Sequence, residues 1–365
     1  MNSESPLLLI GVGTAGCAIA RGVSRAFGEA LRYVLADTDA VSGQAGGPFI
    51  LLGGNRLSGR GSGGDIVASQ LATEDSIKSL DEHLEGVRLA VIVSALGGGT
   101  GGGATLETAK HLSGKGIPTV VFATTPFAFE GADRQRNARG VTAMIEDAAS
   151  TTFFLPLDKL IADTDNMQEA MKRAVDTIAS GVTLFWRLVE KPGYIRLDVE
   201  RIRHILTGSG RGRFATVTVQ GTNRTTEAID RLIRSEMLAT SSGPVKSTLC
   251  GILAGDDLLL SEVGKVAEGV RNAFGGLSFD LATVNDSATF RGSISVVVML
   301  FESNGKSDDD TKPGTVMGAR RRKSKSVLGS GPSGRGRFQN AEPTIWNGED
   351  LDLPTFIRKD ISLDL

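Results

Sequence analysis

The chain has 365 residues and 40% of them are hydrophobic, so one to three domains with sizeable cores are expected. Its two cysteines, Cys17 and Cys250, lie far apart and support neither a disulfide framework nor a metal-ligand pattern, which is typical of a reducing compartment. The net charge is −2, although residues 305–340 carry nine Lys or Arg against three Asp or Glu, so the rest is acidic. An acidic body argues against nucleic acid as the main partner, and no apolar run is long enough to span a bilayer.

The first predicted strand, Leu7–Ile10, leads into a Gly-x-Gly-x-x-Gly turn at residues 11–16 and then a helix from Cys17 to about Ala30. A second strand, Tyr33–Ala36, ends directly before Asp37. This spacing is typical of a dinucleotide-binding fold, in which the acid binds a ribose. An NAD-dependent oxidoreductase of the Rossmann type is therefore one open interpretation.

Two further glycine-rich segments follow. The first covers residues 53–64 and is followed by Asp65, a predicted N-cap for the next helix. Residues 97–103 contain six glycines in seven positions, between an apolar strand at 89–96 and a helix at 104–112. Such a dense run costs much chain entropy, which suggests a backbone that lies very close to a ligand. Successive N–H groups at a helix N-terminus form a phosphate cradle.

The run at 97–103 resembles the GGGTGTG signature of the FtsZ family of tubulin-like proteins, with Gly102 in place of the second Thr. The resemblance implies GTP or GDP with Mg²⁺ as the ligand of all three glycine loops. It also implies an α/β fold with a Rossmann-like GTP-binding domain at 1–165 and a long central helix at 166–192. A second α/β domain with a mixed sheet is then expected at 193–303.

The resemblance extends to residues around the nucleoside. The segment PFAFEGADR places Glu130 at the ribose and Arg134 by the ribose and phosphates, and Asp176 aligns with an Asp that accepts from guanine N1 and N2. Ala18 and Leu157 replace two family Asn residues, which leaves the guanine specificity open. The residues expected to bind the nucleotide are Gly11, Gly13, Thr14, Ala15, Gly16, Gly63, Gly97, Gly98, Gly99, Thr100, Gly101, Gly102, Glu130, Arg134 and Asp176.

The segment after the long helix, 194–201, resembles a family loop of pattern NxDFxD whose acids enter the nucleotide site of the next subunit. Asp198 matches the middle acid and Glu200 lies one position from the last, so these two are the expected catalytic residues. Arg196 stands in place of the Asn and Arg201 in place of the last acid. These changes predict slow GTP hydrolysis and leave open a structural relative that binds nucleotide with little turnover.

The remaining chain divides into three parts. Strands at 215–219, 248–254 and 293–300, with helices near 224–238 and 261–274, are predicted for the second domain. Residues 304–342 are predicted to form a disordered basic linker. Its cluster at 320–325 is either a solubilising charge run or a weak contact for anionic lipid or nucleic acid.

The last segment, 343–365, contains Asp350–Lys359, which resembles the FtsZ tail peptide that docks a membrane adaptor or other division protein. Taken together, the resemblance implies a GTPase that polymerises head to tail into cell-division filaments. It also implies a cytoplasmic location, at the division site on the inner face of the cell membrane.

Overall fold

The structure is a computed structural model. It describes residues 5–27, 31–160, 166–191, 193–239, 243–303, 345–346 and 349–350. The chain forms two units, Met1–Thr311 and Lys312–Leu365. In the second unit, β11 (Ile345–Trp346) pairs antiparallel with β12 (Glu349–Asp350). The predictions for the linker and for the rest of the tail peptide lie outside the described residues.

One ten-stranded sheet forms the frame of the first unit, in the order β3-β2-β1-β4-β5-β6-β7-β10-β8-β9. The strands from β3 to β7 in this order pair in parallel, whereas β10 pairs antiparallel with both β7 and β8. The strands are β1 (Leu7–Val12), β2 (Tyr33–Asp37), β3 (Phe49–Leu51), β4 (Leu89–Ala95), β5 (Thr119–Thr125), β6 (Thr151–Pro156), β7 (Ser209–Gln220), β8 (Val245–Ala254), β9 (Ser278–Asn285) and β10 (Ser293–Ser303).

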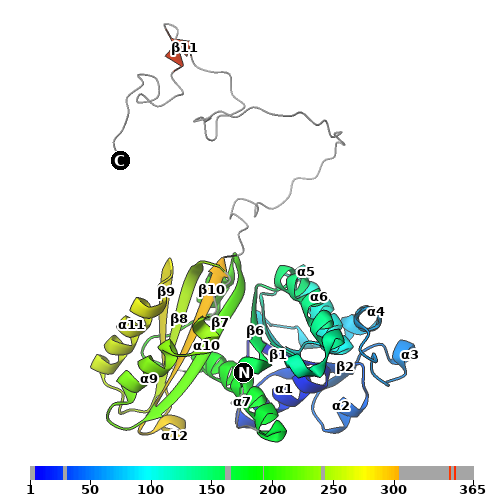
Figure 1. The fold of residues 1–365 in the computed structure, drawn as a ribbon, viewed down its shortest axis with the longest axis horizontal. Coiled ribbons are helices and arrows are strands. Elements are labelled where there is room, and N and C mark those ends of the chain that lie inside the picture. Colours follow the sequence, from blue (N-terminus) through cyan, green and yellow to red (C-terminus); the bar gives the residue numbers. More distant parts are fainter. Residues whose placement is uncertain are drawn as a thin grey trace. The chain divides into compact units, whose positions relative to one another are not determined.

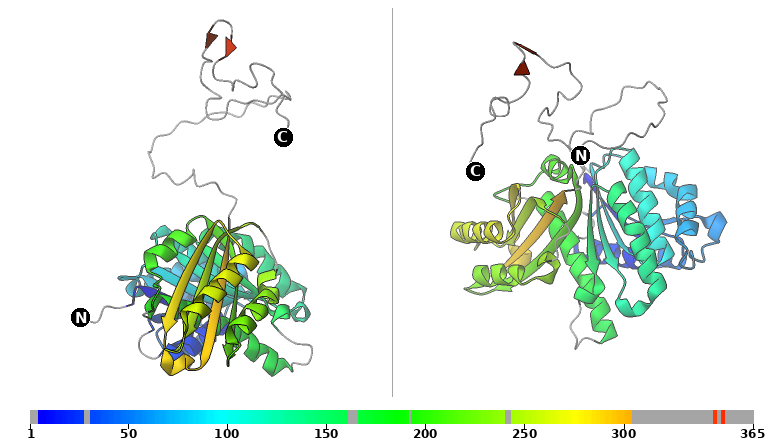
Figure 2. Two further views of the ribbon diagram at one scale, coloured as in Figure 1. Left: turned by 90° about the vertical axis from the view of Figure 1, so that its left-hand side faces the viewer. Right: turned by 45° about the horizontal axis from the view of Figure 1, so that its top comes forward.

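Helices cover both faces of this sheet, and the long helix α7 lies between the parallel half and the half that contains β8 to β10 (Figures 1 and 2). The helices are α1 (Gly13–Phe27), α2 (Val41–Gln44), α3 (Gly54–Leu57), α4 (Ile66–Ser76), α5 (Gly99–Gly114), α6 (Ala132–Ala148), α7 (Met167–Glu190), α8 (Val199–Leu206), α9 (Arg224–Ile233), α10 (Glu236–Ala239), α11 (Leu260–Phe274) and α12 (Ser287–Phe290). The short turns η2 (Ile77–His83), η3 (Ala128–Glu130) and η4 (Leu157–Lys159) complete this unit. No helix in the described part of the chain is both long and apolar enough to cross a membrane.

Helix α7 begins and ends close to its predicted bounds. The Asn166 side chain accepts a hydrogen bond from the Glu169 N–H at 3.0 Å, and the Glu169 carboxylate accepts one from the Asn166 N–H, so the helix starts with a capping box. After the helix, a side chain on Gly193 would come closer than 3.0 Å to the Thr283 carbonyl oxygen. The glycine therefore lets the chain turn tightly against β9.

An aromatic cluster holds the two halves of the sheet together. Phe122 stacks on Phe153 with their ring centroids 4.9 Å apart, and the edge of Phe214 meets both rings. Phe301, on β10, lies 5.8 Å from Phe153. All four rings are almost completely buried. Because β6 and β7 also pair directly, at Thr152 and Phe153, the two halves share one continuous sheet and one hydrophobic cluster that includes residues of both.

Two details of the second half were not expected from the sequence. The predicted helix near 224–238 is divided into α9 and α10, and residues 278–285 form the parallel edge strand β9. The pattern Phe279-Asp280-Leu281-Ala282 contains an acid and offers no regular alternation of apolar and polar residues, so the strand is not evident from the sequence.

Candidate nucleotide site

The three glycine loops meet in one cavity of about 300 Å³. They follow β1, β3 and β4, and the carboxyl ends of neighbouring parallel strands lie at the same edge of a sheet, where α/β proteins bind ligands. The cavity is lined by Val12, Gly13, Thr14, Ala15, Asp37, Asp39, Gly61, Ser62, Gly63, Gly64, Ala95, Leu96, Gly98, Gly99, Thr100, Gly101 and Arg134.

Thr100 connects the segments that build this cavity. Its hydroxyl lies 2.6 Å from the hydroxyl of Thr38 at the end of β2, and 3.2 Å from that of Ser62 in the second glycine segment. Asn137 on α6 donates to the carbonyls of Gly64 and Gly97, at 3.0 and 3.3 Å. These hydroxyl and amide contacts fix the spacing between loops that are far apart in the sequence.

The first and third glycine loops are largely the first turns of helices. We expected helices from Cys17 and Ala104, but α1 already begins at Gly13 and α5 at Gly99. Gly13 has a φ of +72°, which turns the chain from strand to helix within one residue. The amino ends of two long helices therefore reach the cavity and bring free N–H groups and positive potential to it.

The dense glycine run at 97–103 is explained by close packing of the backbone as well as by the expected approach of a ligand. Added Cβ atoms on Gly99, Gly101 and Gly103 would approach the carbonyl oxygens of Asp65, Ala95 and Ile66 to less than 3.0 Å. These glycines thus let α5 lie close against β4 and α4. At Gly98 no atom lies within 4 Å of an added Cβ, and this residue lines the cavity. A side chain at Gly98 would therefore meet open space at the edge of the cavity.

Asp37 belongs to the lining of the cavity, and its carboxylate already has partners. It is 1% exposed and accepts from the Thr14 hydroxyl at 3.0 Å and from the Ser42 hydroxyl at 2.6 Å. In the dinucleotide-binding interpretation this acid would instead bind ribose hydroxyls. Because its oxygens hold α1 and α2 in place, the structure gives that interpretation no support at Asp37.

Most of the predicted nucleotide residues lie in or directly behind the cavity. Gly13, Thr14, Ala15, Gly63, Gly98, Gly99, Thr100, Gly101 and Arg134 line it. Arg134 forms an ion pair with Glu130 at 2.7 Å. The Glu130 carboxylate also accepts a hydrogen bond from the Phe127 N–H. Sequence reasoning missed Thr38, Asp39, Ser62 and Asn137. The residues that stand behind the lining are Gly11, Gly16, Gly97, Gly102 and Glu130.

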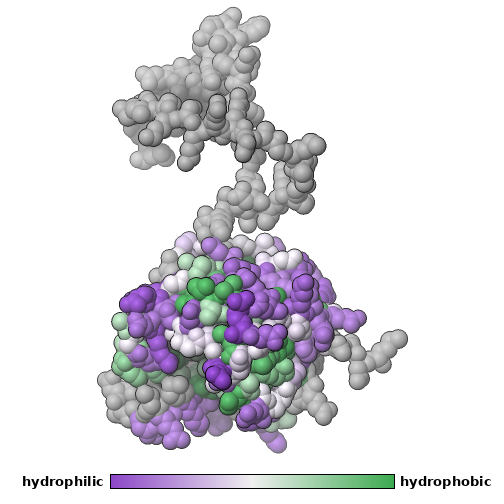
Figure 3. Space-filling view, turned by 90° about the vertical axis from the view of Figure 1, so that its right-hand side faces the viewer, coloured by the Kyte–Doolittle hydropathy of each residue, from purple (hydrophilic) through white to green (hydrophobic). Residues whose placement is uncertain are grey.

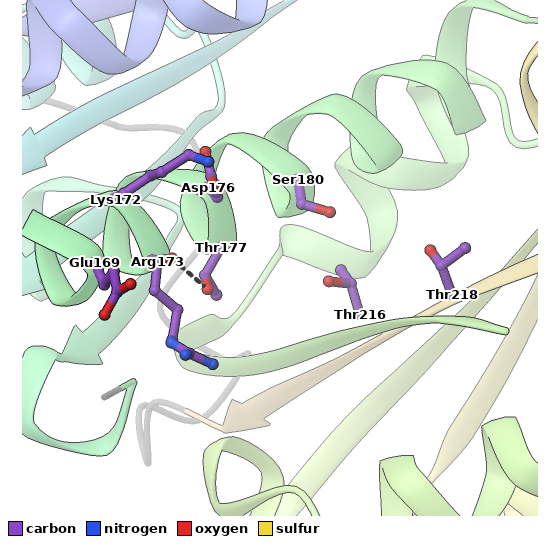
Figure 4. Close-up of a pocket in the computed structure, with 8 residues that line it drawn as sticks. All are labelled: Glu169, Lys172, Arg173, Asp176, Thr177, Ser180, Thr216 and Thr218. Carbon is purple, nitrogen blue, oxygen red and sulfur yellow. Dashed lines mark hydrogen bonds between the residues drawn. The ribbon is translucent and has the colours of Figure 1, made fainter. Parts of the chain in front are cut away.

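Asp176 faces a different hollow. It is exposed on α7 and, with seven other polar residues, lines an open cavity of about 640 Å³ between α7 and β7. Figure 4 shows Lys172 beside Asp176 on the helix and Thr216 and Thr218 on the strand opposite. The structure therefore does not bring Asp176 into the lining of the glycine-loop cavity. Of the two replaced Asn positions, Ala18 is exposed on α1, whereas Leu157 is buried in the core.

The predicted catalytic acids lie at the opposite end of the sheet. Glu200 forms an ion pair with Arg88, the residue directly before β4, whereas the glycine run follows the other end of β4. The seven residues of β4 span roughly 20 Å. Asp198 caps α8 by accepting from the Arg201 N–H at 2.6 Å. Within one subunit, neither acid can reach the cavity.

Arg201 has a partner within its own subunit. Its Nε lies 2.5 Å from a carboxylate oxygen of Asp280 on β9, and this hydrogen bond raises the pKa of the guanidinium above its usual value. Leu197 and Val199 are buried between the exposed residues of the same segment. The loop is thus fastened to the core and to β9.

Comparisons with known proteins agree with this geometry. Residues 6–165 match the family model described as Tubulin/FtsZ family, GTPase domain. The chain is 28% identical over 271 residues to a cell division protein FtsZ from Methanothermobacter thermautotrophicus, which covers 73% of this chain and 71% of that protein. It is 30% identical over 272 residues to FtsZ from Magnetospirillum gryphiswaldense, covering 73% of this chain and 48% of that one. The solved structure of an empty FtsZ dimer from M. jannaschii superimposes with a TM-score of 0.76 and 22% identity, over 82% of this chain and 89% of that chain.

The sheet, the glycine loops and the family match define the first half of the chain as a GTPase domain of the tubulin/FtsZ family. The relatives extend the match to 73% of the chain, so the protein is FtsZ-like, which confirms the resemblance found in the sequence.

Proposed function

We propose that this protein binds GTP in the glycine-loop cavity and polymerises head to tail, so that GTP is hydrolysed where two subunits meet. The observation that carries the proposal is that the glycine-loop cavity and the acids Asp198 and Glu200 lie far apart within one subunit. The cavity lies at the carboxyl end of β4, and the loop with Asp198 lies near its amino end. A neighbour stacked in the same direction would place its loop over the cavity.

Exposed apolar side chains near both ends support such stacking. Val41 on α2, Val67 on α4 and Phe129 on η3 belong to elements around the cavity and are each more than half exposed. Figure 3 shows the side of the unit that carries α3 and α4, where hydrophobic patches lie between hydrophilic ones. At the other end, Tyr194 is 78% exposed and Ile195 is 40% exposed. A contact between two different surfaces forms an open filament when its rotation does not close into a ring.

The donor set of the cavity also fits a magnesium ion. Asp39 and the Thr14 and Thr100 hydroxyls are hard oxygen donors in the lining, and Mg²⁺ is usually held by one or two carboxylates together with substrate phosphates. No cluster of three or more His, Cys, Asp or Glu side chains occurs in the described ranges, so the phosphates would supply most ligands. When bound, the ion would neutralise phosphate charge.

The residues of this chain would divide the chemistry between two subunits. The N–H groups at the starts of α1 and α5 bind the phosphates, and Asp198 of the neighbour orients the attacking water with its remaining carboxylate oxygen. We infer slow turnover, because Glu200 is paired with Arg88 and Arg201 with Asp280. The same pairs favour the second candidate, a filament protein that binds GTP with very little hydrolysis.

Sedimentation with GTP, GDP or no nucleotide, with phosphate release read in parallel, tests the proposed function. We expect pelleted protein only with GTP, and phosphate release that accompanies it. Pelleting with GTP but no phosphate release would select the second candidate. Absence of both nucleotide binding and pelleting would refute the proposal.

Asp176 gives a prediction on base specificity. If its carboxylate accepts from guanine N1 and N2, Asp176→Ala should weaken GTP binding about tenfold or more and leave ATP binding unchanged, since adenine lacks that donor pair. Thr218→Ala, in the same hollow, is the matched control. Equal affinities of the unaltered protein for GTP and ATP, measured by titration with fluorescent analogues, would contradict this assignment.

We also propose that the tail docks a membrane adaptor at the division site in the cytoplasm. Leu351, Leu353, Phe356 and Ile357 surround Pro354, a pattern suited to a partner groove. Removing residues 350–365 should leave GTP-dependent pelleting intact and abolish recruitment to adaptor-bearing vesicles. Phe356→Ala should cause most of that loss, because one aromatic anchor often dominates such contacts. Loss of polymerisation in the truncated chain would assign the tail to the filament instead.

A further inference from the structure

We propose that Arg196 is a catalytic arginine supplied in trans: its guanidinium contacts the terminal phosphate of GTP bound to the neighbouring subunit. This inference rests on the proposed head-to-tail site. By comparison with the family, Arg196 replaces an Asn, and from the sequence alone this change predicts slow hydrolysis. The charges and contacts of the structure point to a gain of positive charge where the site needs it.

The cavity is short of cationic side chains. Among the described residues that line it, Arg134 is the one cation, and Glu130 already pairs with it at 2.7 Å. Asp37 and Asp39 add two carboxylates to the same lining. A nucleoside triphosphate brings several negative charges, which grow at the leaving oxygen during phosphoryl transfer. Backbone N–H groups and, when bound, a magnesium ion would offset part of this charge, and a cation from a neighbouring subunit would offset more of it.

Arg196 is free to provide that charge. It is exposed, and it forms no hydrogen bond or ion pair with any residue that the structure describes. The other arginine of the loop, Arg201, is held by Asp280. Arg196 also shares a hollow of about 280 Å³ with Asp198, so both groups that a neighbour would need stand side by side.

The contacts of its two neighbours fix the backbone of Arg196. The Ile195 N–H donates to the Thr283 hydroxyl at 2.9 Å, and the Thr283 N–H donates to the Ile195 carbonyl at 2.9 Å. On the other side, Leu197 is 4% exposed and packs into the core. The fixed backbone limits the positions that the Arg196 guanidinium can reach, and such positioning favours the stabilisation of a transition state.

The step itself balances without a further reactant. The water oxygen bonds to the γ-phosphorus, and the bond from that phosphorus to the β–γ bridging oxygen breaks. The electron pair leaves with GDP, and the water proton passes to a phosphate oxygen or to Asp198. Arg196 forms no covalent bond; its charge lowers the energy of the transferring phosphoryl group, an effect that reaches about 10³-fold or more in enzymes with such an arginine.

Three variants test the proposal in the full chain. Arg196→Ala should bind GTP and pellet as the unaltered protein does, while phosphate release per pelleted subunit falls at least tenfold. Arg196→Lys should retain an intermediate rate, since a point charge replaces the planar fork. Arg203→Ala, which removes an exposed arginine from α8, is the matched control and should not change the rate. A rate for Arg196→Ala within twofold of the unaltered protein would overturn the assignment.

A mixing experiment tests whether the arginine acts in trans. Arg196→Ala subunits carrying radiolabelled GTP are mixed with excess unaltered subunits and a chase of unlabelled GTP, so that exchanged label does not rebind. Neighbours with Arg196 should restore hydrolysis of the bound label. Continued slow hydrolysis would overturn action in trans. The unaltered protein alone distinguishes a failure of this inference from a failure of the proposed function. If it assembles and releases phosphate but the mixture stays slow, only action in trans is refuted. If it assembles without phosphate release, or does not assemble, the proposed hydrolysis is refuted as well.

Discussion

Gly101→Ala should disrupt the first domain, whereas Gly98→Ala should leave the fold intact and abolish tight GTP binding. A Cβ at Gly101 would come closer than 3.0 Å to the Ala95 carbonyl oxygen, a backbone atom that cannot turn away. Helix α5 would have to move off β4, and we expect a loss of about 3 kcal/mol or more of unfolding free energy. At Gly98 the added methyl group meets open space inside the cavity.

Thermal unfolding and GTP titration of both variants check this prediction. Gly114→Ala, near the end of the same helix, has open space around an added Cβ and is the matched control, with unchanged or slightly raised stability. Two outcomes would contradict the account: a stable Gly101→Ala protein, or Gly98→Ala with unaltered GTP affinity.

The second large effect is expected at Arg224, on α9. Arg224 is 6% exposed, and its guanidinium donates to Glu262 at 2.8 Å through two nitrogens and to Asp257 at 2.5 Å. Arg224→Ala would leave the partly buried Glu262 carboxylate without its partner, at a cost of about 3–5 kcal/mol. Urea unfolding should show this loss, while removal of the exposed Arg231–Glu227 pair, as Arg231→Ala, should cost less than about 1 kcal/mol. Equal effects of the two variants would contradict a structural role for the network.

The same network makes stability depend on pH. The Arg224 guanidinium lowers the pKa of Glu262 from 4.5 to about 2. A carboxyl group whose pKa is lower in the folded chain stabilises the fold above its unfolded pKa, and this contribution is lost as the pH falls from 4.5 to about 2. In Glu262→Gln, the decline of unfolding free energy over this pH range should therefore be smaller.

Local patterns in the sequence predicted much of the site. The predicted N-cap Asp65 accepts from the Ala68 N–H at 3.0 Å, and α7 has nearly its predicted bounds. Each depends on residues a few positions apart. The partner of Arg201 could not be predicted in this way, because Asp280 lies 79 positions away on a strand without a clear pattern. The contact between Thr38 and Thr100 likewise depends on the order of strands in the sheet.

The glycine run at 97–103 was recognised correctly from the sequence, but the sequence explained only part of its role. Density of glycine alone suggested close approach to a ligand, but Gly99 and Gly101 serve the approach of α5 to neighbouring backbone. Only neighbours in space distinguish such glycines from Gly98. The sequence resemblance was sufficient for the family, whereas the division of work among the glycines required the packing.

The dependence of turnover on protein concentration tests the shared site most directly. If one subunit binds GTP and its neighbour supplies Asp198, phosphate release per subunit should be near zero below the concentration at which filaments pellet and rise to a plateau above it. Asp198→Ala should lower the plateau at least tenfold while GTP binding and pelleting persist. A rate per subunit that stays constant from dilute monomer to full assembly would show that each subunit contains a complete site and would contradict the account.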